Sequence, residues 1–246
     1  MPDQDTLEAF LDAARVDDAV FALRPDYRAV LIAVAGLEPG PSDEASEELL
    51  RAAEEVARSA LQRQTVEEVP HIAAWRDAYR AFGAKPQRTR NSLEALMRRA
   101  ASGLPRVNRL TDLYNAISIL HMVPLGGEDL STYVGAPRLI RATGSEPFEI
   151  MADGAPRTEH PDAGEVVWTD AGGVTCRRWN WRQAHRTQLT DTTTSALFIL
   201  DALETLDDDA LLTATRELTS QLARLGPNVQ IAQRWLGTST TPSRGA

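Results

Sequence analysis

The sequence contains a single cysteine, Cys176, so no disulfide can form within the chain. Disulfide frameworks are typical of small secreted proteins, and the first residues also lack the basic start and apolar run of a secretory signal. Long apolar runs are missing as well. The longest, residues 29–37, has nine residues, whereas a membrane-spanning helix needs about 20. We therefore expect a cytoplasmic protein with no membrane partner.

The common sequence signatures of catalysis are also missing. The chain has no GxxxxGK[ST], no GxGxxG after an expected strand, no HExxH and no GxSxG. Its four histidines are far apart, and with one cysteine they give no zinc-ligand spacing. Cys176 and His185 could form a nucleophile and its base, but a cysteine in a buried strand is more often a small hydrophobic residue. We expect no metal and no other cofactor.

The composition is that of a globular protein, with 43% hydrophobic and 25% charged residues in a chain of 246. No internal repeat and no linker divides the sequence, which predicts a single domain over residues 1–236. Residues 237–246 are rich in Ser, Thr, Gly and Pro, and we expect a disordered tail there.

Charge is distributed unevenly. The net charge is -9, yet residues 76–109 hold nine basic and only two acidic side chains. A second run, residues 177–186, holds four arginines and no acid. Such runs are usually solvated faces, but the forked guanidinium group of arginine pairs well with phosphate. From the first run we select candidate RNA-binding residues: Lys85, Arg88, Arg90, Arg98, Arg99 and Arg106.

Hydrophobic periodicity predicts helices in the first half of the chain after an early strand at residues 27–34. Ser42 or Asp43 is expected to cap a long helix. Further helices are expected over 70–82, from Asn91 or Ser92 to Gly103, and over 112–121.

After Pro124, short β-type runs alternate with turns, which predicts a sheet. The expected strands are 138–142, 147–151, 166–169, 174–182 and, with a helix as the alternative, 196–203. Asp153-Gly154 and Gly172-Gly173 are typical hairpin turns. A last helix is expected over 208–225, ended by Gly226-Pro227.

Two segments are more polar than packing requires. In "LPRVNRLTDLYNAIS", residues 104–118, Asn108, Asp112 and Asn115 recur at helical spacing. They could cap the helix and tie a loop, or contact a polar ligand. In "CRRWNWRQ", residues 176–183, an extended conformation would alternate Arg178, Asn180 and Arg182 with the two tryptophans.

The "CRRWNWRQ" segment allows two interpretations. Its Trp179 and Trp181 rings could stack on bases while the arginines hold phosphates, or the whole segment could be a structural strand under a helix.

Several motifs resemble the B3/B4 editing domain of the phenylalanyl-tRNA synthetase beta subunit. "PRVNRLTDLYN" is similar to an arginine-asparagine-aspartate signature of that domain, "VPLGGEDL" and "RLIRATGSEPFEIMADG" resemble two later segments, and "SALFILDAL" resembles a late strand that carries an acidic residue. The similarity is strongest over residues 70–205. It has two departures: Gly126 or Gly127 stands where the synthetase domain has histidine, and "CRRWNWRQ" replaces a glycine-rich segment.

The resemblance implies a mixed α/β fold, the B3/B4 fold, with a central, mostly antiparallel sheet surrounded by helices. It implies a freestanding, trans-acting aminoacyl-tRNA deacylase that removes a wrong amino acid from the 3′ end of tRNA. The alternatives are a noncatalytic module that binds tRNA or an amino acid, and an enzyme acting on a small metabolite.

For the deacylase we assign site residues in two groups. The expected catalytic residues are Asp201, Asn180 and Asn108. The expected substrate-binding residues are Asp112, Asn115, Arg178, Trp179, Trp181, Arg182 and Gln183. The expected partner is tRNA, with no DNA, and the expected state is a monomer.

Overall fold

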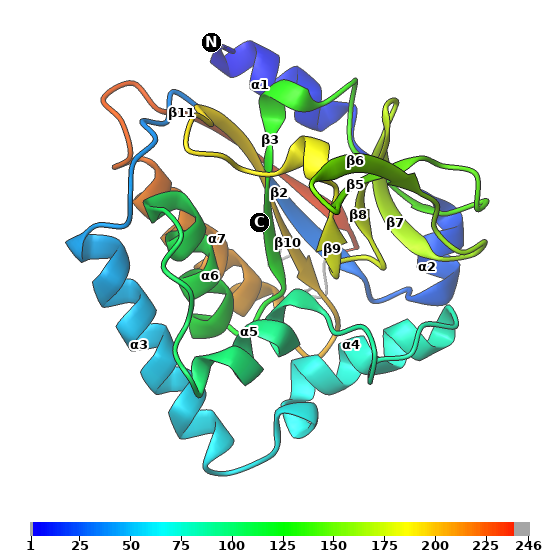
Figure 1. Cartoon of the computed structure of the whole chain (residues 1–246), viewed down its shortest axis with the longest axis horizontal. Coiled ribbons are helices and arrows are strands. Elements are labelled where there is room, and N and C mark those ends of the chain that lie inside the picture. The colour runs from blue at the N-terminus through cyan, green and yellow to red at the C-terminus, as the bar shows by residue number, and fades with distance from the viewer. Residues whose placement is uncertain (1, 239–246) are drawn as a thin grey trace, which may run out of the picture.

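The computed structural model describes residues 2–238, which form seven α-helices and eleven strands (Figure 1). The helices are α1 (Gln4–Asp12), α2 (Asp18–Leu23), α3 (Glu44–Leu61), α4 (Pro70–Ala81), α5 (Ser92–Ala100), α6 (Arg109–Leu120) and α7 (Asp208–Leu222). The strands are β1 (Arg15–Val16), β2 (Arg28–Ala35), β3 (Leu125–Asp129), β4 (Arg138–Arg141), β5 (Phe148–Ala152), β6 (Ala155–Glu159), β7 (Val166–Asp170), β8 (Gly173–Arg177), β9 (Arg182–Gln183), β10 (Ser195–Ala202) and β11 (Gln230–Gly237).

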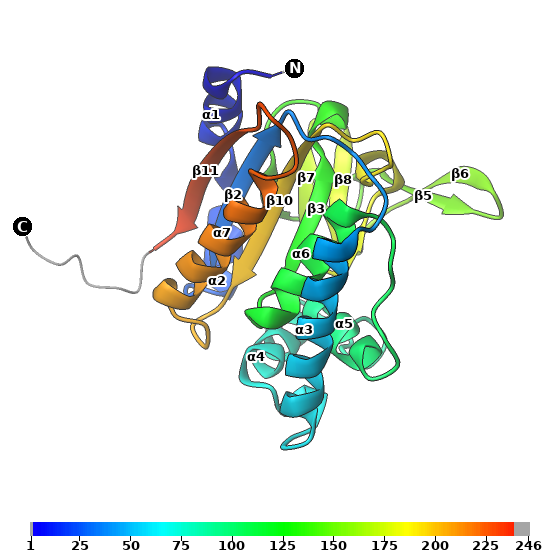
Figure 2. The same ribbon diagram turned by 90° about the vertical axis from the view of Figure 1, so that its left-hand side faces the viewer.

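The central sheet has the strand order β11-β2-β10-β3, and each neighbouring pair is antiparallel. Every residue of β2 and β10 is buried, because the sheet is covered on both faces. Helices α6 and α7 pack on one face, where Phe198 and Leu200 contact Leu113 and Leu218 within one apolar cluster (Figure 2).

The other face of the central sheet meets a second sheet, ordered β1-β4-β7-β8-β9 (Figure 1). Leu197 and Ile199 of β10 point to this side and join a cluster with Trp168 of β7 and Trp75 of α4. Side chains alternate along a strand, so Asp201, two residues after Ile199, points to the same side. The interface between the two sheets therefore receives a buried carboxyl group.

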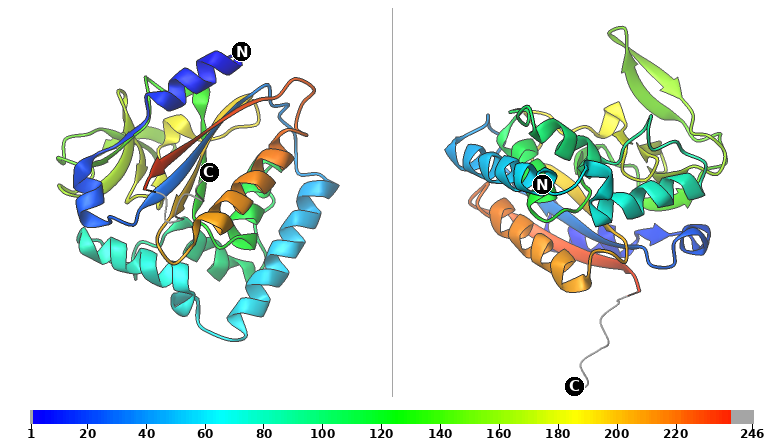
Figure 3. Two further views of the ribbon diagram at one scale, coloured as in Figure 1. Left: turned by 180° about the vertical axis from the view of Figure 1, so that it is seen from behind. Right: turned by 90° about the horizontal axis from the view of Figure 1, so that it is seen from below.

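Helices α3, α4, α5 and α6 form a third cluster beside the central sheet (Figure 3). Asp43 caps α3 by accepting from the backbone of Ser46, as the sequence predicts. Pro70 opens α4 at its first position, where a missing N–H costs nothing. These helices set the position of α5, whose first residue reaches the space between the sheets.

Strands β5 and β6 form a separate hairpin that projects from the body of the molecule (Figure 2). Asp153 and Gly154 both have positive φ, 53° and 77°, at its tip. This is the backbone that the Asp-Gly pair predicts, so the expected hairpin is confirmed.

The expected mixed fold with a mostly antiparallel central sheet and surrounding helices is confirmed. Helix α6 begins at Arg109, earlier than expected. The predicted strand 174–182 is wrong beyond Arg177, because residues 178–181 form a turn between β8 and β9. Of the predicted tail, Gly237 ends β11, and residues 239–246 lie outside the described part of the chain.

Candidate functional site

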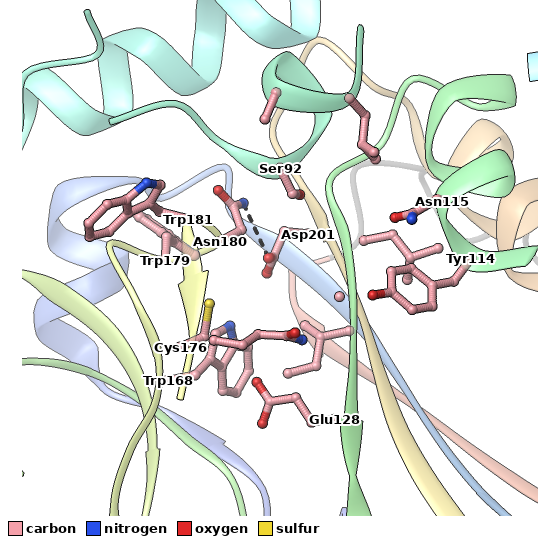
Figure 4. Close-up of a pocket in the computed structure, with 16 residues that line it drawn as sticks. Ser92, Tyr114, Asn115, Glu128, Trp168, Cys176, Trp179, Asn180, Trp181 and Asp201 are labelled. Carbon is pink, nitrogen blue, oxygen red and sulfur yellow. Dashed lines mark hydrogen bonds between the residues drawn. The ribbon is translucent and has the colours of Figure 1, made fainter. Parts of the chain in front are cut away.

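A cavity of about 260 Å³ lies between the two sheets and α5 and α6 (Figure 4). Its walls are mainly apolar and aromatic, with a few polar groups, as in many ligand sites. Ala95 and Trp181 line it and are exposed or partly exposed, so the cavity reaches the surface. The polar and ionisable lining residues are Ser92, Tyr114, Asn115, Glu128, Trp168, Cys176, Trp179, Asn180, Trp181, Gln183 and Asp201.

Asp201 is the central acid of the cavity and is 2% exposed. Tyr27 Oη donates to Oδ1 over 2.6 Å. Asn180 Nδ2 donates to Oδ2 over 3.2 Å (Figure 4). Burial raises the pKa of Asp201 to about 7, against these hydrogen bonds, which favour the carboxylate. A carboxyl group with such a pKa exchanges protons near neutral pH, which suits a general base.

Asn180 is held on both sides of its amide. Tyr79 Oη donates to Asn180 Oδ1 over 3.0 Å, which leaves Nδ2 to donate to Asp201. The backbone carbonyl of Asn180 also accepts from Ser92 N over 2.9 Å, joining the turn to the start of α5. The sequence-predicted pair Asp201 and Asn180 is therefore brought together, with Asn180 positioning the acid.

The turn at residues 178–181 replaces the extended segment expected from the sequence. Arg178 and Trp179 have φ of 47° and 69°, a left-handed conformation that costs free energy for residues with a side chain. Glu165 holds the turn: it accepts from Arg177 Nε and Nη2 over 2.9 and 2.7 Å and from Arg178 N over 3.1 Å. The predicted alternation of faces is consequently wrong here.

The two tryptophans of this turn have different environments. Trp179 is fully buried, with its ring 5.0 Å from that of Tyr27 and 5.2 Å from that of Trp75. Stacking of Trp179 on a base, as the sequence suggested, is excluded by this burial. Trp181 is partly exposed at the cavity, and the Arg178 guanidinium lies 4.5 Å from its ring centre.

Glu128 and Cys176 also line the cavity, and the sequence analysis did not assign either to the site. Burial raises the pKa of Glu128 to about 7, although a hydrogen bond from Tyr133 favours the ionised form. Burial raises the pKa of the Cys176 thiol well above its usual value, and His185 contacts Glu149 instead. A cysteine-histidine pair is therefore not formed, whereas a second buried carboxyl is present.

Glycines occupy β3 where the resemblance places a histidine. A Cβ on Gly127 would lie 2.7 Å from Phe198 Cε1 and 2.9 Å from Leu189 Cδ1, so a side chain there would require both neighbours to move. Gly126 lines the cavity, and a Cβ there would lie 3.3 Å from Gln183 Nε2. Gln183 donates to the Gly127 carbonyl over 2.7 Å, so its amide occupies the space beside Gly126.

Of the three polar residues predicted from the segment that forms α6, Asn108, Asp112 and Asn115, one lines the cavity. Asn115 lines it from α6. Asn108 caps α6 by accepting from Thr111 N over 2.8 Å, and Asp112 is buried with hydrogen bonds from Ser42 and Val107 N. Neither Asn108 nor Asp112 lines the cavity, so the structural interpretation of both is supported.

The predicted RNA-binding residues fall into two groups. Arg98 pairs with Glu67 and Glu94, and Arg106 pairs with Glu47 and Glu54, so acids offset their charge. Arg90 lies 3.7 Å from Glu94, and Arg99 is exposed on α5.

Lys85 and Arg88 instead line a groove of about 440 Å³ together with Arg178. Arg182 is exposed on β9, outside the lining of both the cavity and this groove.

Within residues 2–238, no group of three or more His, Cys, Asp or Glu residues could hold a metal ion. None of the helices in this part of the chain is long and apolar enough to cross a membrane.

Comparison with known proteins identifies a family and similar solved structures. The model of the B3/4 domain matches residues 74–225. The crystal structure of an N-terminal fragment of the phenylalanyl-tRNA synthetase beta-subunit from Pyrococcus horikoshii is similar, with a TM-score of 0.47 and 12% sequence identity, over 92% of this chain and 54% of that one. The chain thus spans about half the length of that fragment. A search of curated proteins finds no match.

Proposed function

The chain belongs to the B3/4 domain family, and from this premise we propose that it is a cytoplasmic, trans-acting deacylase that hydrolyses the ester bond of a mischarged aminoacyl-tRNA. Such a deacylase would act in translation fidelity. This role fits the resemblance of the sequence motifs to a domain of a tRNA synthetase subunit. The cavity between the sheets is the proposed site of hydrolysis.

The charge of the cavity carries this proposal. Asp201 and Glu128 line it, and none of its lining residues among those described is Lys, Arg or His. A free amino acid brings both an ammonium and a carboxylate group, and the carboxylate would be buried here without a cation. An aminoacyl ester keeps the ammonium group but has no free carboxylate. The cavity therefore fits an ester better than a free amino acid.

The proposed reaction needs no protein nucleophile. Asp201 as carboxylate takes a proton from water while the water oxygen attacks the ester carbonyl, and the C–O bond to the ribose then breaks. The proton passes from Asp201 to the leaving ribose oxygen, which gives a free amino acid and a ribose hydroxyl. Asn180 is a positioning residue because it fixes Asp201, while Ser92 Oγ, buried without a partner at the cavity, is a donor available for the oxyanion.

The groove beside the cavity is the proposed seat for RNA phosphates. Arg178 lines the groove and stacks on Trp181, which lines the cavity, so one residue pair separates the two spaces. Lys85 and Arg88 lie in the loop that leads into α5, whose first residue borders the cavity. A 3′ terminus inserted into the cavity would thus bring its phosphates near Lys85 and Arg88, whereas Arg178 in the same groove already contacts Asp162 and Glu165.

A panel of radiolabelled mischarged tRNAs tests the function. At least one tRNA whose amino acid has a side chain without charge should be deacylated faster than by spontaneous hydrolysis. Asp201→Asn should lower the rate constant about 100-fold or more, since it removes the general base. The tRNA affinity of this variant should stay within about two-fold of wild type, because phosphate contacts supply most of the binding.

Two outcomes would count against the deacylase. Retardation of tRNA in a gel without deacylation of any panel member would favour the noncatalytic binding module. Loss of affinity and activity to the same extent in Asp201→Asn would remove the assigned role of this residue.

A further inference from the structure

Glu128 is a buried acid that the proposed hydrolysis does not use. It is 2% exposed and lines the cavity from β3, on the strand next to that of Asp201 (Figure 4). In the register of the sheet Glu128 lies opposite Leu197, four residues before Asp201, or about 13 Å along the strand between Cα atoms. The two acids therefore line one cavity from neighbouring strands.

The two carboxyl groups also differ in their hydrogen bonds. Both oxygens of Asp201 accept from protein donors, Tyr27 and Asn180. Glu128 accepts from Tyr133 through Oε2, and Thr175 and the more distant Arg186 also favour its ionised form. Within residues 2–238 no arginine or lysine forms a salt bridge with Glu128, because Arg186 pairs with Asp170, so a cationic group of a ligand would meet no competing ion pair at Glu128.

A second observation at the same cavity points to a polar ligand. Trp168 is 1% exposed and lines the cavity, and its buried Nε1 lies near the Asp201 carboxyl, whose ionised form it favours, without a hydrogen bond of ordinary geometry. Unpaired buried polar groups are rare in folded proteins, because each costs free energy of desolvation. The cavity thus holds a buried carboxyl group outside any salt bridge of the described residues, together with an indole N–H that lacks a hydrogen bond of ordinary geometry.

We propose that Glu128 binds the α-ammonium group of the substrate, so that the protein acts on aminoacyl esters with a free α-amine and rejects N-blocked and α-hydroxy analogues. The inference rests on the proposed deacylase function and names its substrate class. It assigns Glu128 to recognition and Asp201 to proton transfer. An N-acylated amine has no charge to pair with Glu128, and a peptidyl chain is too large for the cavity of about 260 Å³.

Binding of small esters tests this role without any hydrolysis. The probes are methyl esters of alanine, valine, leucine and phenylalanine, each compared with the matching α-hydroxy methyl ester and with the free amino acid. Calorimetry is performed on the full chain carrying Asp201→Asn, so that the esters are not consumed. At least one amine ester should bind at millimolar concentration and about 10- to 100-fold more tightly than its hydroxy partner, as expected for a charge-assisted hydrogen bond.

The variant Glu128→Gln, combined with Asp201→Asn, should remove this preference. The affinity for the amine ester should fall to that for the hydroxy ester. The affinity for the hydroxy ester should stay within about three-fold of its value in Asp201→Asn alone, because this ester makes no ion pair with Glu128. If Glu128 had only a structural role, Glu128→Gln would weaken the binding of both esters equally, and that result would overturn the proposal. Failure of every amine ester to bind, or equal binding of amine and hydroxy esters before Glu128 is changed, would overturn it as well.

Kinetics separate this inference from the proposed function. With tRNA substrates, Glu128→Gln alone should lower kcat/KM for aminoacyl-tRNA about 10- to 100-fold and leave the slower hydrolysis of deaminated, α-hydroxyacyl-tRNA nearly unchanged. If no tRNA is hydrolysed by wild type, the deacylase proposal fails while the binding experiment still decides the role of Glu128.

Discussion

Asp201 illustrates how one buried side chain links chemistry to stability. Its carboxyl has three aromatic or amide neighbours and a pKa of about 7, so at neutral pH about half of the molecules hold it ionised. The ionised half is the form that can act as a base. The same burial makes ionisation unfavourable for the folded chain.

The pH dependence of the reaction follows from this pKa. We expect kcat/KM to rise about ten-fold per pH unit below pH 7 and to level off above it, because only the carboxylate accepts a proton. Initial rates between pH 5 and 8, corrected for spontaneous ester hydrolysis, measure the profile. A profile that is flat between pH 5 and 7 would contradict a base with this pKa.

The pH dependence of stability has the opposite sign. In the unfolded chain Asp201 loses its proton near pH 4, whereas in the folded protein it keeps the proton until about pH 7. Between these values the folded state binds more protons, so the free energy of unfolding falls as pH rises. The full effect corresponds to roughly 4 kcal/mol, and Asp201→Asn should remove most of it.

Urea denaturation of wild type and Asp201→Asn at pH 5 and pH 8 provides the measurement. Glu128, whose pKa is also raised to about 7, adds an effect of the same sign that the variant retains. Identical pH dependence in both proteins would show that Asp201 is not neutral in the folded state at pH 5.

At the scale of elements, the turn between β8 and β9 depends on Glu165. This residue is 1% exposed and binds both the Arg177 side chain and the Arg178 backbone. Glu165→Ala should lower the free energy of unfolding by about 3 kcal/mol, because it removes the two short hydrogen bonds of the buried Arg177 and leaves it only a longer contact to Glu159. It should also lower activity, since the same turn carries Asn180.

Asp17→Ala is the matched control for this prediction. Its ion pair with Arg138 is exposed on both sides, and an exposed pair contributes below about 1 kcal/mol. Chemical denaturation of the two variants gives the comparison. Similar losses for Glu165→Ala and Asp17→Ala would show that Glu165 does not hold the turn.

The elements themselves were predictable where local signals were strong. The long amphipathic pattern of α3 with its Asp43 cap, Pro70 at the start of α4, and the Asp153-Gly154 hairpin all fix local structure by their own backbone chemistry. Strand β3 was missed because its sequence, LGGED, has little β propensity and is held only by pairing with β10.

The site was predictable in part for the same reason. Asp201 follows the alternation of an apolar strand, and the segment with Asn180 and Trp181 is unusually polar, so both could be selected from the sequence. Glu128 could not be, because nothing local distinguishes it from a surface acid. Burial of Trp179 likewise follows from the left-handed turn at 178–181. This turn could not be predicted, because the segment has no glycine, the residue that usually adopts this conformation.

For the molecule as a whole, acids pair with many arginines of the two basic runs, including Arg178 at the groove, which contacts Asp162 and Glu165. The acid-rich first third of the chain supplies Glu47, Glu54 and Glu67, which pair with Arg98 and Arg106 of the basic run. The sequence distribution alone could not show this pairing. Lys85 and Arg88 remain at the groove beside Arg178.

The double variant Lys85→Ala, Arg88→Ala should weaken tRNA binding about ten-fold at low salt and reduce the slope of log affinity against log salt by about 2. Arg98→Ala with Arg106→Ala should leave tRNA affinity within about two-fold, because their charge is already paired. Filter binding at several salt concentrations measures both slopes. A larger loss of tRNA affinity in the Arg98→Ala, Arg106→Ala variant would indicate that the RNA binds at α5 and the face of α3 instead of at the groove.

The hydrogen bond between Tyr27 and Asp201 joins residues that are 174 positions apart in the sequence. Loop closure of that length must precede any assembly of the cavity, so the native topology has many distant contacts and favours slow folding. During synthesis, a nascent chain that has not reached residue 201 lacks this carboxyl altogether. The protein should therefore acquire its ligand-binding ability only after β10 has been synthesised, as one cooperative event.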